Sequence, residues 1–235
     1  MKKINIFLIL LLSALLLLSA FMVCREKYEQ QTEKKEFEKL LEIIEPIKET
    51  TEPTDTSMDT GSETTNATES EAAEAEVQTR NLAPLFAKNA ECIGWIYIEG
   101  TNVNYPVMHT PDNPQKYLRK NFDGEYSQSG VPFLDARCSV DGGTAIIYGH
   151  NMKNGTQFSD LKKYLNADFR NSHPTIEFQT EAGVHFYTVV DVIRTDIYDE
   201  IYNQINEDDN TLILSTCYGS AKSGRLLIIA KEATG

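Results

Sequence analysis

Eight short segments between residues 94 and 231 have the composition of β-strands, and they constrain the fold more than any other feature of the chain. Each segment is rich in β-branched or aromatic residues, and turn residues separate it from the next. The segments are residues 94–98, 103–108, 130–134, 144–148, 175–178, 184–193, 211–216 and 224–231. Short helices are expected only over residues 82–89 and 157–165. This pattern predicts a mainly β domain, either an antiparallel or mixed β-barrel or a β-sandwich.

The composition of the chain changes near residue 80, and this change places the folded domain at residues 81–235. The first 80 residues contain 16 acidic and nine basic side chains and few aromatic ones, whereas the single tryptophan is Trp95. A domain of roughly 155 residues is large enough for one hydrophobic core. The net charge of the whole chain is −13. It argues against a nucleic-acid partner, because phosphate binding needs a basic face.

An uncharged apolar run, residues 4–23, lies near the start of the chain. Its length is close to the ~20 residues that a helix needs to cross a bilayer. It is longer than the apolar region of a cleaved signal peptide, and residues 21–23, Phe-Met-Val, form a poor cleavage site. We therefore predict an uncleaved membrane anchor over residues 1–24. A cleaved signal peptide and a lipoprotein signal at Cys24 are the alternatives.

Residues 25–80 connect this anchor to the domain, and two different structures are predicted for them. Residues 25–49 have helical spacing, and Pro46 is expected to end the helix. The apolar stripe of this helix consists of Phe37, Leu40, Leu41 and Ile44. Residues 50–76 are rich in Thr, Ser and Glu and have no apolar period, so they cannot bury enough surface to fold. We predict a helical and then disordered acidic stalk that holds the domain away from the membrane.

The cysteines offer one candidate nucleophile. The four cysteines are Cys24, Cys92, Cys138 and Cys217. Their spacing contains no CxxC pair, so we expect no thiolate metal site, and no motif in the sequence indicates an organic cofactor. Cys92 and Cys138 are interpreted as packing residues. Cys217 ends a strand segment and precedes a polar loop, so it can lie at a barrel rim, although a buried cysteine is the ordinary alternative.

Two further residues lie where strands begin or end. His150 follows the apolar segment 144–148 and a glycine, and Arg225 begins the strand segment after Cys217. A hairpin from Cys217 to Arg225 would bring the guanidinium close to the thiol. The remaining histidines, in loops or within a strand segment, are His109, His173 and His185. Thiol catalysis needs a nucleophile, an acid/base partner and an oxyanion donor. Cys217, His150 and Arg225 could supply these three groups. A surface arginine at a strand start is the alternative for Arg225.

Together these motifs resemble the sortases, which are membrane-anchored cysteine transpeptidases of Gram-positive cell surfaces. Residues 214–217, LSTC, with Arg225 after a short loop, resemble the cysteine signature of the family. Residues 146–152, IIYGHNM, resemble the histidine segment of class B members. Other segments in the expected order are residues 94–96, 105–107, 117–118 and 133–135. The resemblance covers about residues 82–232, and it implies an eight-stranded sortase-type β-barrel with short helices.

The resemblance also implies a reaction and its partners. Cys217 would attack a carbonyl in the C-terminal sorting motif of a secreted protein, His150 would be the acid/base, and Arg225 would stabilise the oxyanion or hold the substrate. An amine of a peptidoglycan precursor, or a pilin-type lysine, would then resolve the thioacyl enzyme. The anchor would cross the cell membrane once, with the catalytic domain outside the cell.

Other expectations remain open at this point. Because no carboxylate neighbours Cys217 in the sequence, a Cys–His pair with Arg225 is expected rather than a triad. The connection of residues 196–210 is shorter than the resemblance implies. A hydrolytic surface cysteine peptidase using the same residues is one alternative function. A stalked surface domain that binds without catalysis is the other.

Overall fold

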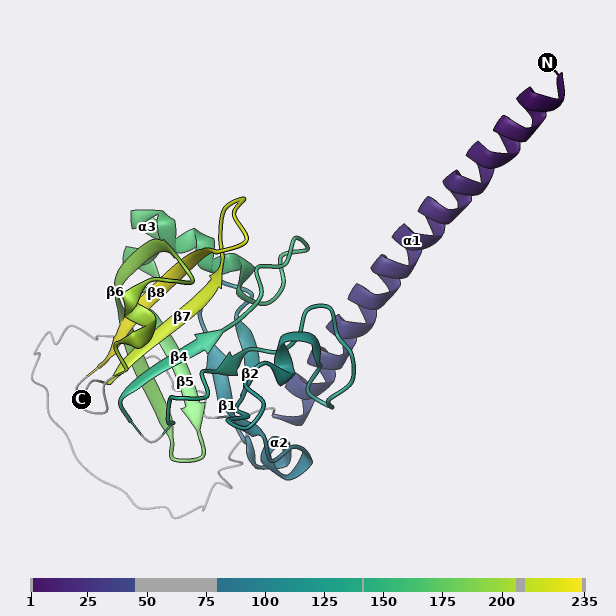
Figure 1. Cartoon of the computed structure of the whole chain (residues 1–235). Coiled ribbons are helices and arrows are strands. Elements are labelled where there is room, and N and C mark those ends of the chain that lie inside the picture. The colour runs from purple at the N-terminus through teal and green to yellow at the C-terminus, as the bar shows by residue number, and fades with distance from the viewer. Residues whose placement is uncertain (1, 45–79, 141, 206–209, 234–235) are drawn as a thin grey trace, which may run out of the picture.

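A closed barrel of eight strands forms the body of the molecule in this computed structural model, which describes residues 2–44, 80–140, 142–205 and 210–233 (Figure 1). The strands follow one another around the barrel in the order β1-β2-β3-β4-β7-β8-β6-β5, and the barrel closes because β5 pairs with β1. The strands are β1 (Cys92–Tyr97), β2 (Asn104–Met108), β3 (Phe133–Leu134), β4 (Thr144–Tyr148), β5 (Thr175–Thr180), β6 (Val184–Asp196), β7 (Thr211–Cys217) and β8 (Gly224–Glu232). The mainly β fold and the barrel are thereby confirmed, and each predicted segment overlaps a strand.

Helical elements are few within the described part of the barrel domain. They are α2 (Ala83–Lys88), α3 (Ala167–Ser172) and the 3₁₀ helices η1 (Lys116–Arg119), η2 (Phe158–Leu165) and η3 (Glu200–Asn203). A single long helix, α1 (Lys2–Ile43), precedes them and extends away from the barrel (Figure 1).

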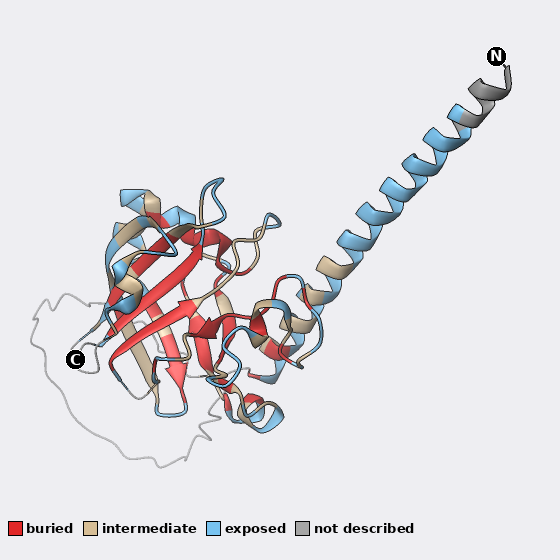
Figure 2. Cartoon of the chain, in the orientation of Figure 1, coloured by how far each residue is buried: buried red, intermediate tan, exposed pale blue. Residues whose placement is uncertain are grey.

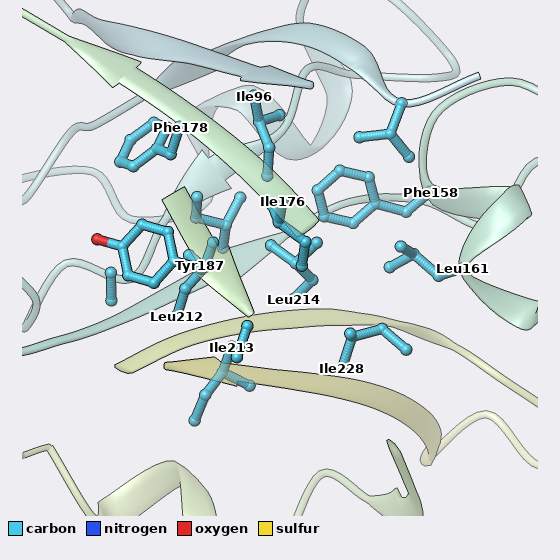
Figure 3. Packing of buried hydrophobic residues seen from close by; sticks show 14 of the residues in the cluster. Ile96, Phe158, Leu161, Ile176, Phe178, Tyr187, Leu212, Ile213, Leu214 and Ile228 are labelled. Atoms are coloured by element: carbon cyan, nitrogen blue, oxygen red, sulfur yellow. The ribbon is translucent and has the colours of Figure 1, made fainter. Parts of the chain in front are cut away.

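The parallel pair of β4 and β7 runs through the hydrophobic core. Both strands are almost continuously buried, as is usual for strands that are covered on both faces. Figure 3 shows Leu212 and Leu214 of β7 among side chains from the other strands, with Phe158 and Leu161 of η2 beside them. Burial of this apolar run fixes the register of the two strands, and so the position of the residues that follow them.

Two elements differ from those predicted. β3 is shorter than residues 130–134, because the Val131 N–H donates to the Tyr117 carbonyl (3.1 Å) and Pro132 has no N–H. The segment predicted as a helix at residues 157–165 is the 3₁₀ helix η2. Its buried large side chains recur every third residue, which matches the three residues per turn of a 3₁₀ helix.

The C-terminal end of α1 packs against the barrel domain. Leu40 and Ile44 are only 4% and 2% exposed, and the Phe37 ring lies edge-on to Tyr105 at a centroid distance of 5.0 Å. Figure 2 shows this change along α1, whose free part is exposed and whose last turns alternate between exposed, intermediate and buried residues. The apolar stripe of the predicted stalk helix therefore docks on the domain, a contact that nothing in the local sequence predicts.

The predicted membrane anchor and stalk precede the barrel domain. Within those ranges, no helix has both the length and the apolar character that crossing a membrane would require. The anchor over residues 1–24 thus stays a prediction. Pro46 and residues 50–76, predicted as the helix end and the disordered stalk, lie outside the described residues.

Candidate active site

Cys217 and Arg225 face each other across a hairpin. Cys217 is the last residue of β7 and is exposed, whereas the six residues before it in the strand are buried. The antiparallel register of β7 and β8 pairs it with Arg225, as the sequence predicts. Nη1 of Arg225 donates to the carbonyls of Lys222 (3.0 Å) and Gly224 (2.8 Å), so the guanidinium is held against its own turn.

His150 lies at the same end of the barrel as Cys217. The parallel register of β4 and β7 pairs Tyr148 with Ser215, and each chain continues for two residues, to His150 and to Cys217. Equal continuation from a paired position brings the two side chains to the same rim of the barrel. The structure therefore brings together the three residues singled out in the sequence, and all three line one pocket of about 700 Å³.

Hydrogen bonds between the two strand ends fix the backbone around the Cys217 thiol and the His150 imidazole. Thr216 Oγ1 donates to the Gly149 carbonyl (2.7 Å), and Asn151 Nδ2 donates to the Cys217 carbonyl (2.9 Å). Gly149 also permits the close approach of the next element, since a Cβ there would lie 2.5 Å from the Phe158 ring. A larger residue at position 149 would push η2 away from the loop of residues 150–157, called here the histidine loop.

The protonation of the imidazole follows from one hydrogen bond. His150 Nε2 lies 2.9 Å from the carbonyl oxygen of Leu118. A carbonyl only accepts, so Nε2 carries a hydrogen and Nδ1 is the nitrogen that gains or loses a proton. Burial lowers the pKa of His150, the Leu118 bond opposes this, and the charges of Arg119 and Arg225 lower it further. The neutral ring, with a basic Nδ1, is therefore favoured at neutral pH.

The carboxylate in the pocket serves another partner. Asp135 accepts a hydrogen bond from Tyr148 (2.8 Å) and a bidentate pair from Arg137 (2.9 and 2.8 Å). Burial raises the pKa of Asp135, but the hydrogen bonds from Arg137 and Tyr148 outweigh burial and lower it to about 2. The oxygen atom that orients His150 thus belongs to a main-chain carbonyl, which agrees with the expectation of a Cys–His pair instead of a triad.

Aromatic rings form much of one side of the pocket. Tyr148 stacks on Tyr202 at a centroid distance of 6.3 Å, and the hydroxyls of Tyr202 and Ser215 lie 2.8 Å apart. Tyr202 belongs to η3, and Ile197 from the same connection also lines the pocket. The connection before β7 is short, but it still contributes a wall.

The other thiols and imidazoles lie elsewhere. Cys92 and Cys138 are buried and free, and burial raises the pKa of Cys92 to about 11, as befits packing residues. Of the four histidines, each within the described residues, His150 alone lines the pocket. His185, for example, pairs with Glu232 at 2.7 Å.

Sequence reasoning missed the contribution of Leu118. Its side-chain type is irrelevant to the bond with His150, because the acceptor is the main-chain carbonyl. The segment of Tyr117 and Leu118 stood out only through its place in the family-like order of motifs. A main-chain acceptor leaves no mark on residue type, so no local pattern could have identified it.

The sequence matches a known protein family over most of the barrel. Residues 96–233 match the family described as Sortase, Sortase domain. Sortase B of Listeria monocytogenes is 40% identical over 119 residues, which are 49% of this chain and 46% of that protein. Sortase B of Staphylococcus aureus is 31% identical over 173 residues, 61% of this chain and 70% of that protein. The match to the Listeria protein thus spans less than half of its length.

Solved structures show the same fold. Sortase B of Clostridium perfringens superposes with a TM-score of 0.57 and 26% identity, over 64% of this chain and 98% of the other. A sortase B-like protein from Bacillus anthracis gives 0.57 and 30% identity, over 66% and 85%. A Staphylococcus aureus sortase B–substrate complex gives 0.57 and 26% identity, over 64% and 83%.

Proposed function

The chain belongs to the sortase family, and from this premise we propose that it is a membrane-anchored cysteine transpeptidase. It cleaves a C-terminal sorting motif of secreted proteins and joins the new carboxyl end to an amine of the cell wall or of another surface protein. One observation carries the proposal most strongly. Cys217, His150 and Arg225, which come from three strand ends, line a single pocket.

In the first step, the Cys217 thiol gives its proton to Nδ1 of the neutral His150 ring as the sulfur attacks the scissile carbonyl carbon. A carbon–sulfur bond forms, and the negative charge that develops on the carbonyl oxygen is stabilised by the guanidinium of Arg225, whose planar N–H donors suit an oxyanion. The carbon–nitrogen bond then breaks. His150 gives the proton on Nδ1 to the leaving amine, and a thioacyl enzyme remains.

In the second step, an incoming amine replaces the thiol. His150 removes a proton from the amine as its nitrogen attacks the thioacyl carbon. The carbon–sulfur bond then breaks, and the proton on Nδ1 passes to the leaving Cys217 sulfur, which restores the thiol and the neutral ring. The lowered pKa of His150 keeps its ring neutral and ready to accept this proton. The Leu118 carbonyl keeps Nδ1, instead of Nε2, in this role.

We assign the remaining parts of the chain by the same premise. Residues 1–24 anchor the protein in the cell membrane, residues 25–80 connect it, and residues 81–235 are the catalytic domain on the outer side. The acceptor is an amine of a peptidoglycan precursor or a pilin-type lysine. The pocket volume of about 700 Å³ lies within the range of ligand sites, so it is large enough for a short segment of a peptide.

The test uses the full chain in detergent micelles with a panel of sorting-motif peptides and an amine acceptor. Mass spectrometry of the products should show peptide joined to the amine, with hydrolysed peptide as a minor product. Hydrolysed peptide without any amine product would instead indicate a hydrolytic cysteine peptidase. Peptide binding without either product would indicate a binding domain that does not catalyse.

A further inference from the structure

A segment outside the barrel strands touches both α1 and the candidate active site. Residues 117–131 run from η1 to β3, and Tyr117, Leu118 and Val131 line the pocket. The same segment receives the docked end of α1, where Tyr117 and Leu40 belong to one buried cluster. The wall of the pocket is therefore also the surface on which α1 sits.

The carboxylate of Glu33 on α1 makes the most concentrated polar contact of this interface. Its Oε1 accepts hydrogen bonds from Ser127 Oγ (2.7 Å), the Gln128 N–H (2.8 Å) and the Ser129 N–H (3.3 Å). Its Oε2 accepts a further bond from Ser129 Oγ. Both serines are only 3% exposed, so a charged acceptor gathers donors that have little access to water.

From these serines a continuous series of contacts leads to the imidazole. Ser127 Oγ also accepts from the Gly130 N–H (3.1 Å), and the Val131 N–H donates to the Tyr117 carbonyl (3.1 Å). Gly130, with a φ of +61°, packs so closely that a Cβ would lie 2.7 Å from the Leu118 carbonyl oxygen. That oxygen is the acceptor of the hydrogen bond from His150 Nε2.

A second route reaches the other side of the histidine loop. Gln157 is fully buried, and its Nε2 donates to the Gly130 carbonyl (3.1 Å). Its backbone N–H donates to the Tyr105 hydroxyl (3.0 Å), and the Tyr105 ring contacts Phe37 of α1. Gln157 has a φ of +56°, a conformation that the surrounding contacts must maintain in a residue other than glycine. The loop from His150 to Gln157 is thus also braced by α1.

We propose that Glu33 is a positioning residue for the reaction, because its carboxylate docks α1 on residues 127–129 and so holds the Leu118 carbonyl and the His150 ring in place. This inference rests on the proposed role of His150. The active site is fully ordered only when the C-terminal end of α1 is docked on the barrel domain. A catalytic domain that begins at residue 81 lacks this brace.

Glu33→Gln in the full chain tests the proposal, because it preserves the side-chain shape but replaces one acceptor oxygen with an NH₂ donor that faces other donors. Glu38→Gln is the matched control. Glu38 lies five residues further along α1, and its side chain is 56% exposed and pairs only loosely with Lys34 (3.8 Å). The first readout is an NMR titration of the His150 ring in detergent micelles. It requires no turnover, so it separates this proposal from the proposed function.

The expected result is a rise in the pKa of His150 toward its ordinary value in Glu33→Gln, by roughly half a unit or more, as the loosened ring gains hydration. A weaker Leu118 bond acts in the opposite direction, but burial is the larger influence on this pKa, so the rise should prevail. Arg119 hydrogen-bonds the Gln128 carbonyl (2.7 Å), and its charge would move away from the ring with the loop, which also raises the pKa. None of the other charged or titratable groups of the pocket is replaced in this variant: Arg225, Asp135, Arg137, Cys217, Tyr117, Tyr148 and Tyr202.

The kinetic readout should agree with the titration. In Glu33→Gln, kcat should fall about tenfold while KM changes less than about twofold, and the acid limb of the pH profile should move to higher pH. Glu38→Gln should match the wild type in every measurement. If Glu33→Gln has a low melting temperature, Ser129→Ala, which removes one donor, should show the same pKa shift in smaller degree. An unchanged titration of His150 in folded Glu33→Gln, or an equal shift in Glu38→Gln, would overturn the proposal.

Discussion

Two walls of the pocket are built by different means. The wall that carries Cys217 and Arg225, the strand wall, consists of strand ends, and the register of β7 with β8 sets its geometry. The other wall, the loop wall of residues 116–137, contains only the four residues of η1 and the two of β3 as regular elements. Side-chain hydrogen bonds and the docked end of α1 maintain it.

This difference separates chemistry from positioning. A strand ladder places its residues through many main-chain bonds, so a single side-chain change there should alter the reaction and leave the fold intact. The loop wall depends on a few buried contacts, so a change there should alter stability and the orientation of His150.

Cys217→Ala should reduce turnover by about 10⁴-fold or more while the fold remains unchanged, because the nucleophile is lost from an exposed strand end. Steady-state product formation and thermal melting measure the two properties. Cys24→Ala is the matched control, since Cys24 is exposed on α1 and should be dispensable. Substantial turnover in Cys217→Ala would show that the strand wall does not carry the chemistry.

Leu40→Ala should reduce the free energy of unfolding by about 3 kcal/mol, because a fully packed leucine of the α1 interface leaves a cavity. Urea denaturation can be followed through Trp95, the single tryptophan, which is buried in the same cluster. In the control Ile43→Ala, the replaced side chain is 41% exposed, so its effect should stay within about 0.5 kcal/mol. Equal effects of the two variants would mean that α1 does not brace the loop wall.

Arg225→Lys should lower kcat/KM by about 100-fold, since a point charge cannot reproduce the planar set of guanidinium donors beside Cys217. Arg194→Lys, on the neighbouring strand β6 and stacked on Tyr218, provides a control for the loss of a guanidinium. Initial rates with a peptide and an amine acceptor measure the effect. Near-normal activity of Arg225→Lys would remove this residue from the mechanism.

Asp135→Asn should make the protein less sensitive to acid, by about 2 kcal/mol at most. The pKa of Asp135 is about 2 in the folded protein, below the ordinary value of 3.8. Its contribution to stability is therefore present above pH 3.8 and is lost as the pH falls through about 2. Urea unfolding over this range measures it, with Asp123→Asn, a half-exposed carboxylate, as the control. An unchanged acid dependence in Asp135→Asn would show that the Arg137 and Tyr148 bonds contribute little.

The strand wall could be predicted from the sequence, and the loop wall could not. Strand composition and turn residues located β4, β7 and β8, and the positions of Cys217 and His150 just past two apolar runs placed them at a rim. The Leu118 carbonyl, the buried amide of Gln157 and the docking of Glu33 join segments far apart in the sequence. Such contacts arise from tertiary packing and have no local pattern, which also explains why a stalk was predicted where α1 docks.

The most direct test is the intact mass of the full chain, quenched with acid after incubation with a cleavable sorting-motif peptide and no amine. A thioacyl intermediate on Cys217 predicts an added mass equal to the acyl part of the peptide. This mass should map to the fragment that contains Cys217, disappear on treatment with hydroxylamine, and be absent from Cys217→Ala. An adduct on another cysteine, or one that persists in Cys217→Ala, would contradict the assignment of the nucleophile.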